Sequence, residues 1–343
     1  MTQVGSPLAP GALITSNVGD SVKAMNRLIP HIKPSSQYED KVNTIIKIIE
    51  STRKNPKYEA FDNTILRAKL TDIIAKKEAL RFVLPIFHGK CSSRKFTIAN
   101  SPDCAEYLAV ETLGELHGLI ADVYPNTRIY LISEGHLHTD VDHLIGNEAD
   151  IEYYTETITT MLQKYPGLVF CDAIDMLDGT TREQQRNKLL NDYSPNEGAL
   201  RSRMRSEVYL TELYRVYIKL HLALINDQPL KSTSRSQLRS KAKQRAMLQL
   251  RKYVGFAKLI EEAFGPSSYV KLSPLYKSPT QHEQIGINVI KGIHTLGTIT
   301  FHSICKTHAG ILLLTAEEAR QAGYHLVEDR FPYFLEEGQE PWA

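Results

Sequence analysis

Apolar residues repeat with two different periods along the chain, and the change between them predicts an α/β fold. EDKVNTIIKIIES carries apolar residues at helical spacing, which is typical of a helix with one buried face. These residues are Val42, Ile45, Ile46 and Ile49. Short apolar runs, typical of strands, follow at 81–87, 127–133 and 168–174. Helical patterns at 101–124, with Ser101 as the expected N-cap, and at 151–166 separate the runs, and this alternation predicts a parallel sheet.

The pattern changes again near residue 195. A helical stretch is predicted over about 195–265, and β character returns in SYVKLSPL, INVIKG and TITFHSICK before a short helix in TAEEARQAG. We therefore expect an α/β, Rossmann-like fold with a mostly parallel sheet, an added helical region and a C-terminal β-rich part. The expected divisions are a flexible arm over 1–20, a helical segment over 21–80 and an α/β domain over 81–335.

Composition is that of an ordinary globular protein. The chain has 343 residues, is 42% hydrophobic and 23% charged, and carries a net charge of +2, which favours neither a nucleic-acid nor a membrane partner. The four cysteines form no CxxC pair, which argues against a zinc ribbon or a disulfide framework. No stretch approaches the roughly eighteen apolar residues of a membrane span, and no signal-peptide pattern is visible. We expect a reduced, cytoplasmic protein.

Residues 230–258 are strongly basic, with nine Lys or Arg and no acidic residue. This run could bind nucleic acid or a phosphate, or it could be the solvated face of a helix. The balanced total charge and the lack of interleaved aromatic residues argue against a nucleic-acid groove. We therefore favour the solvated helix face.

Polar residues follow each of the three predicted strands, at the edge where open parallel sheets bind ligands. The first strand is followed by His88-Gly89-Lys90 and by a hydroxyl-rich, cationic loop of Ser92, Ser93, Arg94 and Lys95. The second is followed by Ser133-Glu134-Gly135, and the third by Asp172 and Asp175. Cations suit a phosphate or carboxylate, whereas carboxylates suit an amine or a proton transfer. We expect a small substrate that carries both an anion and an amine.

The stretch SEGHLHTDVDHLIG, residues 133–146, raises the question of a metal site. If this stretch is extended, two histidines and two aspartates share one face; they are His136, His138, Asp140 and Asp142. Imidazole and carboxylate are common metal ligands, but such a cluster predicts a metal poorly until its geometry is known. A metal site and ordinary histidines therefore both remain open from the pattern.

Several motifs in order resemble the pyoverdine/dityrosine biosynthesis family, which comprises isocyanide (isonitrile) synthases and a related yeast spore-wall enzyme. The motifs are FHGKCSSRKFTIANSPDCAEYLAVETL, VYPNTRIYLISEGHLHTDV, LYRVYIKLHL, YVKLS and TITFHSI. They are similar to the family's Phe-Lys-Ser-type loop, Pro-Asp-x-x-Glu helix start, Ser-Asp-Gly strand end, Leu-Tyr-Arg helix, Arg-Leu-Ser strand and Thr-Pro-Trp-His segment. The resemblance runs from about residue 80 to 335.

The resemblance implies an isonitrile synthase of secondary metabolism. Such an enzyme converts the α-amino group of a tyrosine- or tryptophan-like amino acid to an isocyanide, with ribulose 5-phosphate as the carbon donor. It implies Lys90, Asp140 and His302 as catalytic residues. The implied substrate contacts are Ser92, Ser93, Arg94, Lys95, Ser133, Glu134, His136, Arg215, Lys271 and Ser273.

The resemblance also bears on cofactors and partners. Of the His/Asp cluster only Asp140 matches the family, so we expect no metal, and no cofactor besides ribulose 5-phosphate as co-substrate. His136 then replaces a cationic residue beside the substrate pocket, and His138 and His143 are ordinary surface or half-buried histidines. The expected pathway neighbour is an iron(II)/2-oxoglutarate oxygenase.

Departures from the family pattern keep two alternatives open. Ser-Asp-Gly becomes Ser133-Glu134-Gly135, the family's Arg-Leu-Ser-Ile-His becomes Lys-Leu-Ser-Pro-Leu at 271–275, and the Trp before His302 is Phe301. The alternatives are a sugar-phosphate-dependent transferase or lyase of different chemistry, and a non-catalytic binding protein on a decayed enzyme fold. A dinucleotide enzyme and a serine hydrolase are disfavoured, because neither GxGxxG after a strand nor GxSxG is present.

Overall fold

The computed structural model describes residues 38–52, 63–141, 144–226, 234–265, 268–274, 284–293 and 298–342. The expected arm over 1–20, Asp142 and His143 lie outside these residues. The described part begins with α2 (Tyr38–Ser51) and α3 (Thr64–Ala75). α2 buries the four apolar positions that the spacing selects, Val42, Ile45, Ile46 and Ile49, so this helix prediction is confirmed.

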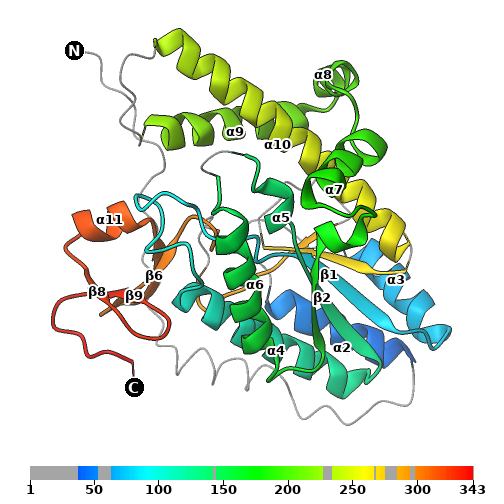
Figure 1. The fold of residues 1–343 in the computed structure, drawn as a ribbon. Helices are drawn as coiled ribbons and strands as arrows, with labels where there is room; N and C mark the ends of the chain where they lie inside the picture. Colours follow the sequence, from blue (N-terminus) through cyan, green and yellow to red (C-terminus); the bar gives the residue numbers. More distant parts are fainter. Residues whose placement is uncertain are drawn as a thin grey trace.

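A parallel sheet with strand order β3-β2-β1-β4-β5 lies at the centre of the described chain (Figure 1). Its strands are β1 (Leu80–Pro85), β2 (Thr127–Ser133), β3 (Leu168–Asp172), β4 (Val270–Ser273) and β5 (Gln284–Gly286). In β1 the side chains alternate, with Phe82 and Leu84 in the main core and Val83 in a second core on the other face. The predicted α/β class with a mostly parallel sheet is confirmed.

Helices cover both faces of this sheet, as the apolar side chains on each face require. The main core holds apolar residues of α2, α3, α4 (Cys104–Val123) and α6 (Glu148–Leu162). The second core holds residues of η1 (Ala173–Met176), η2 (Leu189–Tyr193) and the end of α10 (Arg235–Phe264). Three further helices lie between β3 and β4 in the described chain. They are α7 (Arg182–Lys188), α8 (Glu197–Ser206) and α9 (Val208–Asn226). None of the described helices is long and apolar enough to cross a membrane.

The C-terminal part forms a second, mixed sheet with strand order β7-β6-β9-β8 (Figure 1). Its strands are β6 (Ser303–Thr307), β7 (Gly310–Leu314), β8 (His325–Val327) and β9 (Tyr333–Leu335), and α11 (Ala316–Gln321) lies between β7 and β8 in the chain. Ile304 and Leu313 join the main core, whereas Cys305 and Phe334 pack against α11. The predicted β-rich C-terminal part is confirmed.

Two local expectations are wrong, and the conformation of the histidine-rich stretch, which the sequence left open, is now defined. α4 begins at Cys104, because Asp103 and Glu106 form a capping box and Asp103 rather than Ser101 is the N-cap. Residues 287–292, INVIKG, form a loop that follows β5 and not a strand. Only the first of them, Ile287, makes an isolated β-bridge. GHLH is the short helix α5 (Gly135–His138), so the side chains of this stretch do not alternate as in a strand.

Candidate active site

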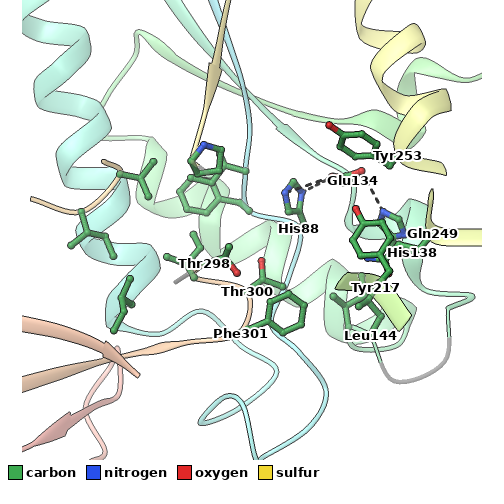
Figure 2. A pocket seen from close by; sticks show the side chains of 18 of the residues that line it. His88, Glu134, His138, Leu144, Tyr217, Gln249, Tyr253, Thr298, Thr300 and Phe301 are labelled. Atoms are coloured by element: carbon green, nitrogen blue, oxygen red, sulfur yellow. Dashed lines mark hydrogen bonds and ion pairs between the residues drawn. The ribbon is translucent and has the colours of Figure 1, made fainter. Parts of the chain in front are cut away.

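A cavity of about 210 Å³ lies at the carboxyl edge of the parallel sheet (Figure 2). Four segments that leave the sheet line it, with His88 after β1, Glu134 after β2, Pro274 after β4 and Asn288 after β5. Further walls come from α9 and α10 and from residues 298–301, the approach to β6. The cavity is therefore at the edge where parallel sheets bind ligands.

Glu134 lies between two imidazoles at the polar end of this cavity, as Figure 2 shows. Its Oε1 is 3.7 Å from Nε2 of His88, and its Oε2 accepts a hydrogen bond from Nε2 of His138 at 3.3 Å. The backbone N–H of Glu134 also donates to Nδ1 of His88 at 3.3 Å. A carboxylate held between two imidazoles can receive an ammonium group and can move protons.

The backbone around His88 is held in unusual geometry. The preceding Phe87 has a positive φ of 62°, which is costly for a bulky residue, and Gly89 has a φ of 114°. Gly135 packs so closely on this turn that a Cβ on it would lie 2.5 Å from the carbonyl oxygen of His88. The turn and the start of α5 therefore fix His88 and Glu134 relative to each other.

We predict that Gly135→Ala displaces this turn, because a methyl group cannot occupy the space beside the backbone oxygen of His88. We expect a loss of about 1–3 kcal/mol in the free energy of unfolding, the usual range for overpacking, together with weaker substrate binding. Urea denaturation and calorimetry measure the two effects. Gly118→Ala is the matched control, because a Cβ there meets nothing within 4 Å. Equal stability of the two variants would contradict the prediction.

The helices α9 and α10 contribute a second polar wall. Tyr217 comes from α9, and Gln249 and Tyr253 come from α10. Oε1 of Gln249 accepts a hydrogen bond from Nε2 of the buried His221 at 2.9 Å, and burial lowers the pKa of His221 to about 4, so this histidine is neutral at pH 7. Burial also raises the pKa of Tyr217 and Tyr253, which remain protonated phenols. This wall therefore offers neutral hydrogen-bonding groups.

Apolar side chains supply much of the remaining surface of the cavity. The largest come from the segments after β5 and before β6, from the stretch before α6 and from β7; they are Leu144, Ile145, Val289, Ile290, Ile293, Ile299, Phe301 and Leu313. Among the described residues that line the cavity, Glu134 is the carboxylate and there is no Lys or Arg. An apolar molecule with one ammonium group is the natural complement of such a surface.

Lys90 is fully buried beneath the cavity wall rather than in a solvated loop. Its Nζ is 3.0 Å from carboxylate oxygens of both Asp103 and Glu106. It also donates to the carbonyl oxygens of Ile299 and His302, at 2.7 and 3.2 Å. Burial alone would lower the pKa of Lys90, but the two carboxylates outweigh it and raise this pKa. These contacts hold the segment before β6 in place. They also occupy the N–H donors of the Lys90 ammonium group, which are then not available to a substrate.

The other two residues expected to be catalytic also lie outside the cavity lining. Asp140 forms an ion pair with Lys252 of α10, whose side chain is fully buried. His302 directly precedes β6, and its Nδ1 is 2.8 Å from the carbonyl oxygen of Thr298. The structure thus does not bring the predicted trio of Lys90, Asp140 and His302 together around one cavity.

The predicted substrate contacts are dispersed. Glu134 alone of this set lines the cavity. Ser92 and Ser93 are half-buried, Arg94 is exposed, and Lys95 pairs with Glu317 at 3.0 Å. Ser133 is buried and accepts from the N–H of Gly135, and Ser273 is buried at the end of β4. Lys271 is half-buried in β4, and Arg215 is exposed on α9. Their roles in binding stay predictions.

His136 and His138 point to different partners, which bears on the metal question. Nδ1 of His136 is 2.6 Å from Oδ2 of Asp172, and its pKa is raised because Asp172 outweighs the effect of burial. His138 instead lines the cavity and is buried, so it is not the ordinary histidine that we expected. Within the described residues, no group of three or more His, Cys, Asp or Glu is arranged to hold a metal ion.

The cavity is also lined by residues that sequence reasoning did not select. His88 lies in the His88-Gly89-Lys90 motif after the first strand, but the sequence alone predicts no role for it. Tyr217 lies in the Leu-Tyr-Arg motif region, and Gln249 and Tyr253 lie four residues apart on α10, so they share a helix face. The spacing of four residues between Gln249 and Tyr253 is a signal that the helix in the basic run at 230–258 has a second face that is not solvated.

Fold and site together define an α/β protein with acid–base groups in a cavity at the carboxyl edge of a parallel sheet. The chain belongs to the pyoverdine/dityrosine biosynthesis protein family, whose sequence profile matches residues 70–327. The predicted family membership is therefore confirmed.

Known proteins with similar sequences or structures agree with this assignment. The L-tryptophan isonitrile synthase AmbI1 of Fischerella ambigua is 23% identical over 270 residues, which cover 76% of this chain and 80% of that protein. Isocyanide synthase A of Aspergillus fumigatus is 30% identical over 80 residues, 22% of this chain and 13% of that protein. The crystal structure of PvcA from Pseudomonas aeruginosa has a TM-score of 0.73 at 20% identity, covering 86% of this chain and 99% of that one, which establishes the shared fold.

Proposed function

We propose that the protein is an isonitrile synthase that joins the α-amino group of an apolar, tyrosine- or tryptophan-like amino acid to the carbonyl carbon of ribulose 5-phosphate. The observation that carries the proposal is the cavity, in which Glu134 lies between His88 and His138 and apolar side chains supply much of the remaining surface. Two relatives whose names contain isonitrile or isocyanide synthase support the same chemistry.

The chain's own groups fit the first steps of such a reaction. Glu134 binds the ammonium group of the amino acid and removes a proton to leave a nucleophilic amine. The apolar wall receives the side chain, and the phenols of Tyr217 and Tyr253 offer hydrogen bonds to substrate oxygens. The open cavity and the connected carboxylate and imidazoles favour an enzyme over the non-catalytic alternative.

Incubation of the purified protein with ribulose 5-phosphate and the twenty amino acids tests this function. We expect one amino acid to be consumed and converted to a product that has gained one carbon and lost two hydrogens, detected by mass spectrometry. Omission of ribulose 5-phosphate is the control and should leave every amino acid intact. Consumption of the ketose without any isocyanide would favour a different sugar-phosphate transferase or lyase.

We further predict that the enzyme needs no metal and no added cofactor, because imine chemistry requires proton transfers rather than a Lewis acid. Dialysis against a chelator should leave the rate of isocyanide formation unchanged. Stoichiometric zinc or iron by elemental analysis, with activity lost on its removal and regained on its return, would contradict this. A gene for an iron(II)/2-oxoglutarate oxygenase beside this one would support the proposed pathway.

A further inference from the structure

His88 has a hydrogen-bonding pattern that fixes where its proton resides. Its Nδ1 accepts a hydrogen bond from the backbone N–H of Glu134 at 3.3 Å, and an acceptor nitrogen cannot itself carry a proton. The neutral ring must then carry its proton on Nε2. The groups that act electrostatically on the ring are Glu134, His138 and Asp172, and burial outweighs the two carboxylates, so that the pKa of His88 is lowered.

The Nε2 side of the His88 ring faces Glu134, which also lines the cavity. His88 is a lining residue, and its Nε2 is 3.7 Å from Oε1 of Glu134, which is too long for a hydrogen bond between them. A hydrogen-bond donor and an acceptor therefore lie side by side in the polar end of the cavity (Figure 2). Such a pair suits a reaction in which a nitrogen loses a proton, which the acceptor can take, while an oxygen gains negative charge, which the donor can stabilise.

We propose that His88 is a catalytic residue that stays neutral and donates a hydrogen bond from Nε2 to the carbonyl oxygen of the ketose during amine addition. This role rests on the proposed function. The sequence alone predicts no role for His88, and it predicts only substrate binding for its partner Glu134. The backbone N–H of Glu134 fixes the His88 ring with its proton on Nε2. The Nε2–H donor is therefore in place before the substrate binds, and it does not depend on protonation of the ring.

The addition step balances without any further reactant. The amine nitrogen forms a bond to the carbonyl carbon, and the π electron pair of the C=O bond moves to oxygen. His88 stabilises the resulting oxyanion and keeps its own proton. Glu134, which holds the proton that it took from the ammonium group, gives this proton to the oxyanion. It then takes one proton from the positively charged nitrogen, which leaves a neutral carbinolamine and a protonated Glu134.

NMR of the ligand-free protein with ¹⁵N-labelled histidine tests the protonation state directly. The His88→Gln variant assigns the His88 signals by their loss. We expect a neutral ring with the proton on Nε2 at pH 7, and no titration of this ring until the pH falls below the ordinary histidine value of about 6.5. An imidazolium at pH 7, or a proton on Nδ1, would overturn the proposal even if isocyanide is formed.

Kinetics of two variants test the catalytic role. Gln places an N–H donor near the position of Nε2, whereas Leu places none, so His88→Gln should retain kcat within about tenfold and His88→Leu should lose about 10²–10³-fold in kcat. KM for the amino acid should change little in both. Wild-type kcat for His88→Leu, or equal loss in both variants, would overturn the role. A wild type that forms no isocyanide would overturn the proposed function, and this role with it.

Discussion

Glu134→Gln is expected to fold normally and to lose about 10²–10⁴-fold in kcat for isocyanide formation, the range for removal of a general base. The amide keeps the size of the side chain and an oxygen that can accept from His138, but it cannot take a proton from an ammonium group. Steady-state kinetics measure the loss, and circular dichroism with urea denaturation checks the fold. KM for the amino acid should also rise, because the ammonium loses its counter-charge.

Glu156→Gln provides the matched control, since Glu156 is an exposed carboxylate on α6 and does not line the cavity. This variant should keep wild-type kcat and KM. Turnover of Glu134→Gln within a few-fold of wild type would show that the carboxylate between the imidazoles does not transfer the proton, and the site assignment would then be wrong.

Lys90→Met is expected to destabilise the protein by about 3–5 kcal/mol, the cost of leaving buried carboxylates without their counter-charge. Asp103 and Glu106 both lie 3.0 Å from the ammonium and are themselves buried. The loss should be accompanied by a change at the cavity, because Lys90 also binds the carbonyl oxygens of Ile299 and His302. Chemical denaturation of the purified variant measures the free energy of unfolding.

Lys95→Met is the control for this prediction, because Lys95 forms an exposed ion pair with Glu317 and such pairs contribute about 0–1 kcal/mol. If Lys90→Met does not yield folded protein, the triple variant Lys90→Met, Asp103→Asn, Glu106→Gln removes the stranded charges and should recover soluble protein. Wild-type stability of Lys90→Met would contradict the structural role that the buried contacts give to this residue.

Helical and strand periodicity predicted the fold well because each signal is local. The stripe on α2 and the apolar runs of β1 to β3 depend on neighbouring residues alone, and they are confirmed. The start of α4 was missed because Ser101 and Asp103 are both good N-caps, and the reciprocal bond to Glu106 decides between them. α5 was missed because four residues are too short to show a helical period.

The site was predicted only in part, because its residues come together through tertiary structure. Glu134 was found because it follows a strand of the parallel sheet. Lys90 also follows a strand, yet it turns into the core, where two carboxylates from the start of α4 meet it. Tyr217, Gln249 and Tyr253 lie in helices far along the chain, and only the packing of α9 and α10 places them at the cavity.

The most direct test of the central claim is a reaction with an ¹⁵N-labelled amino acid and ribulose 5-phosphate labelled with ¹³C at its carbonyl carbon. The amino acid is the one that the mixture experiment identifies. We predict a product whose NMR spectrum shows ¹³C bonded directly to ¹⁵N at an isocyanide carbon, formed by the wild type and not by Glu134→Gln. An isocyanide without ¹³C, or a ¹³C-labelled product without ¹⁵N, would contradict the account.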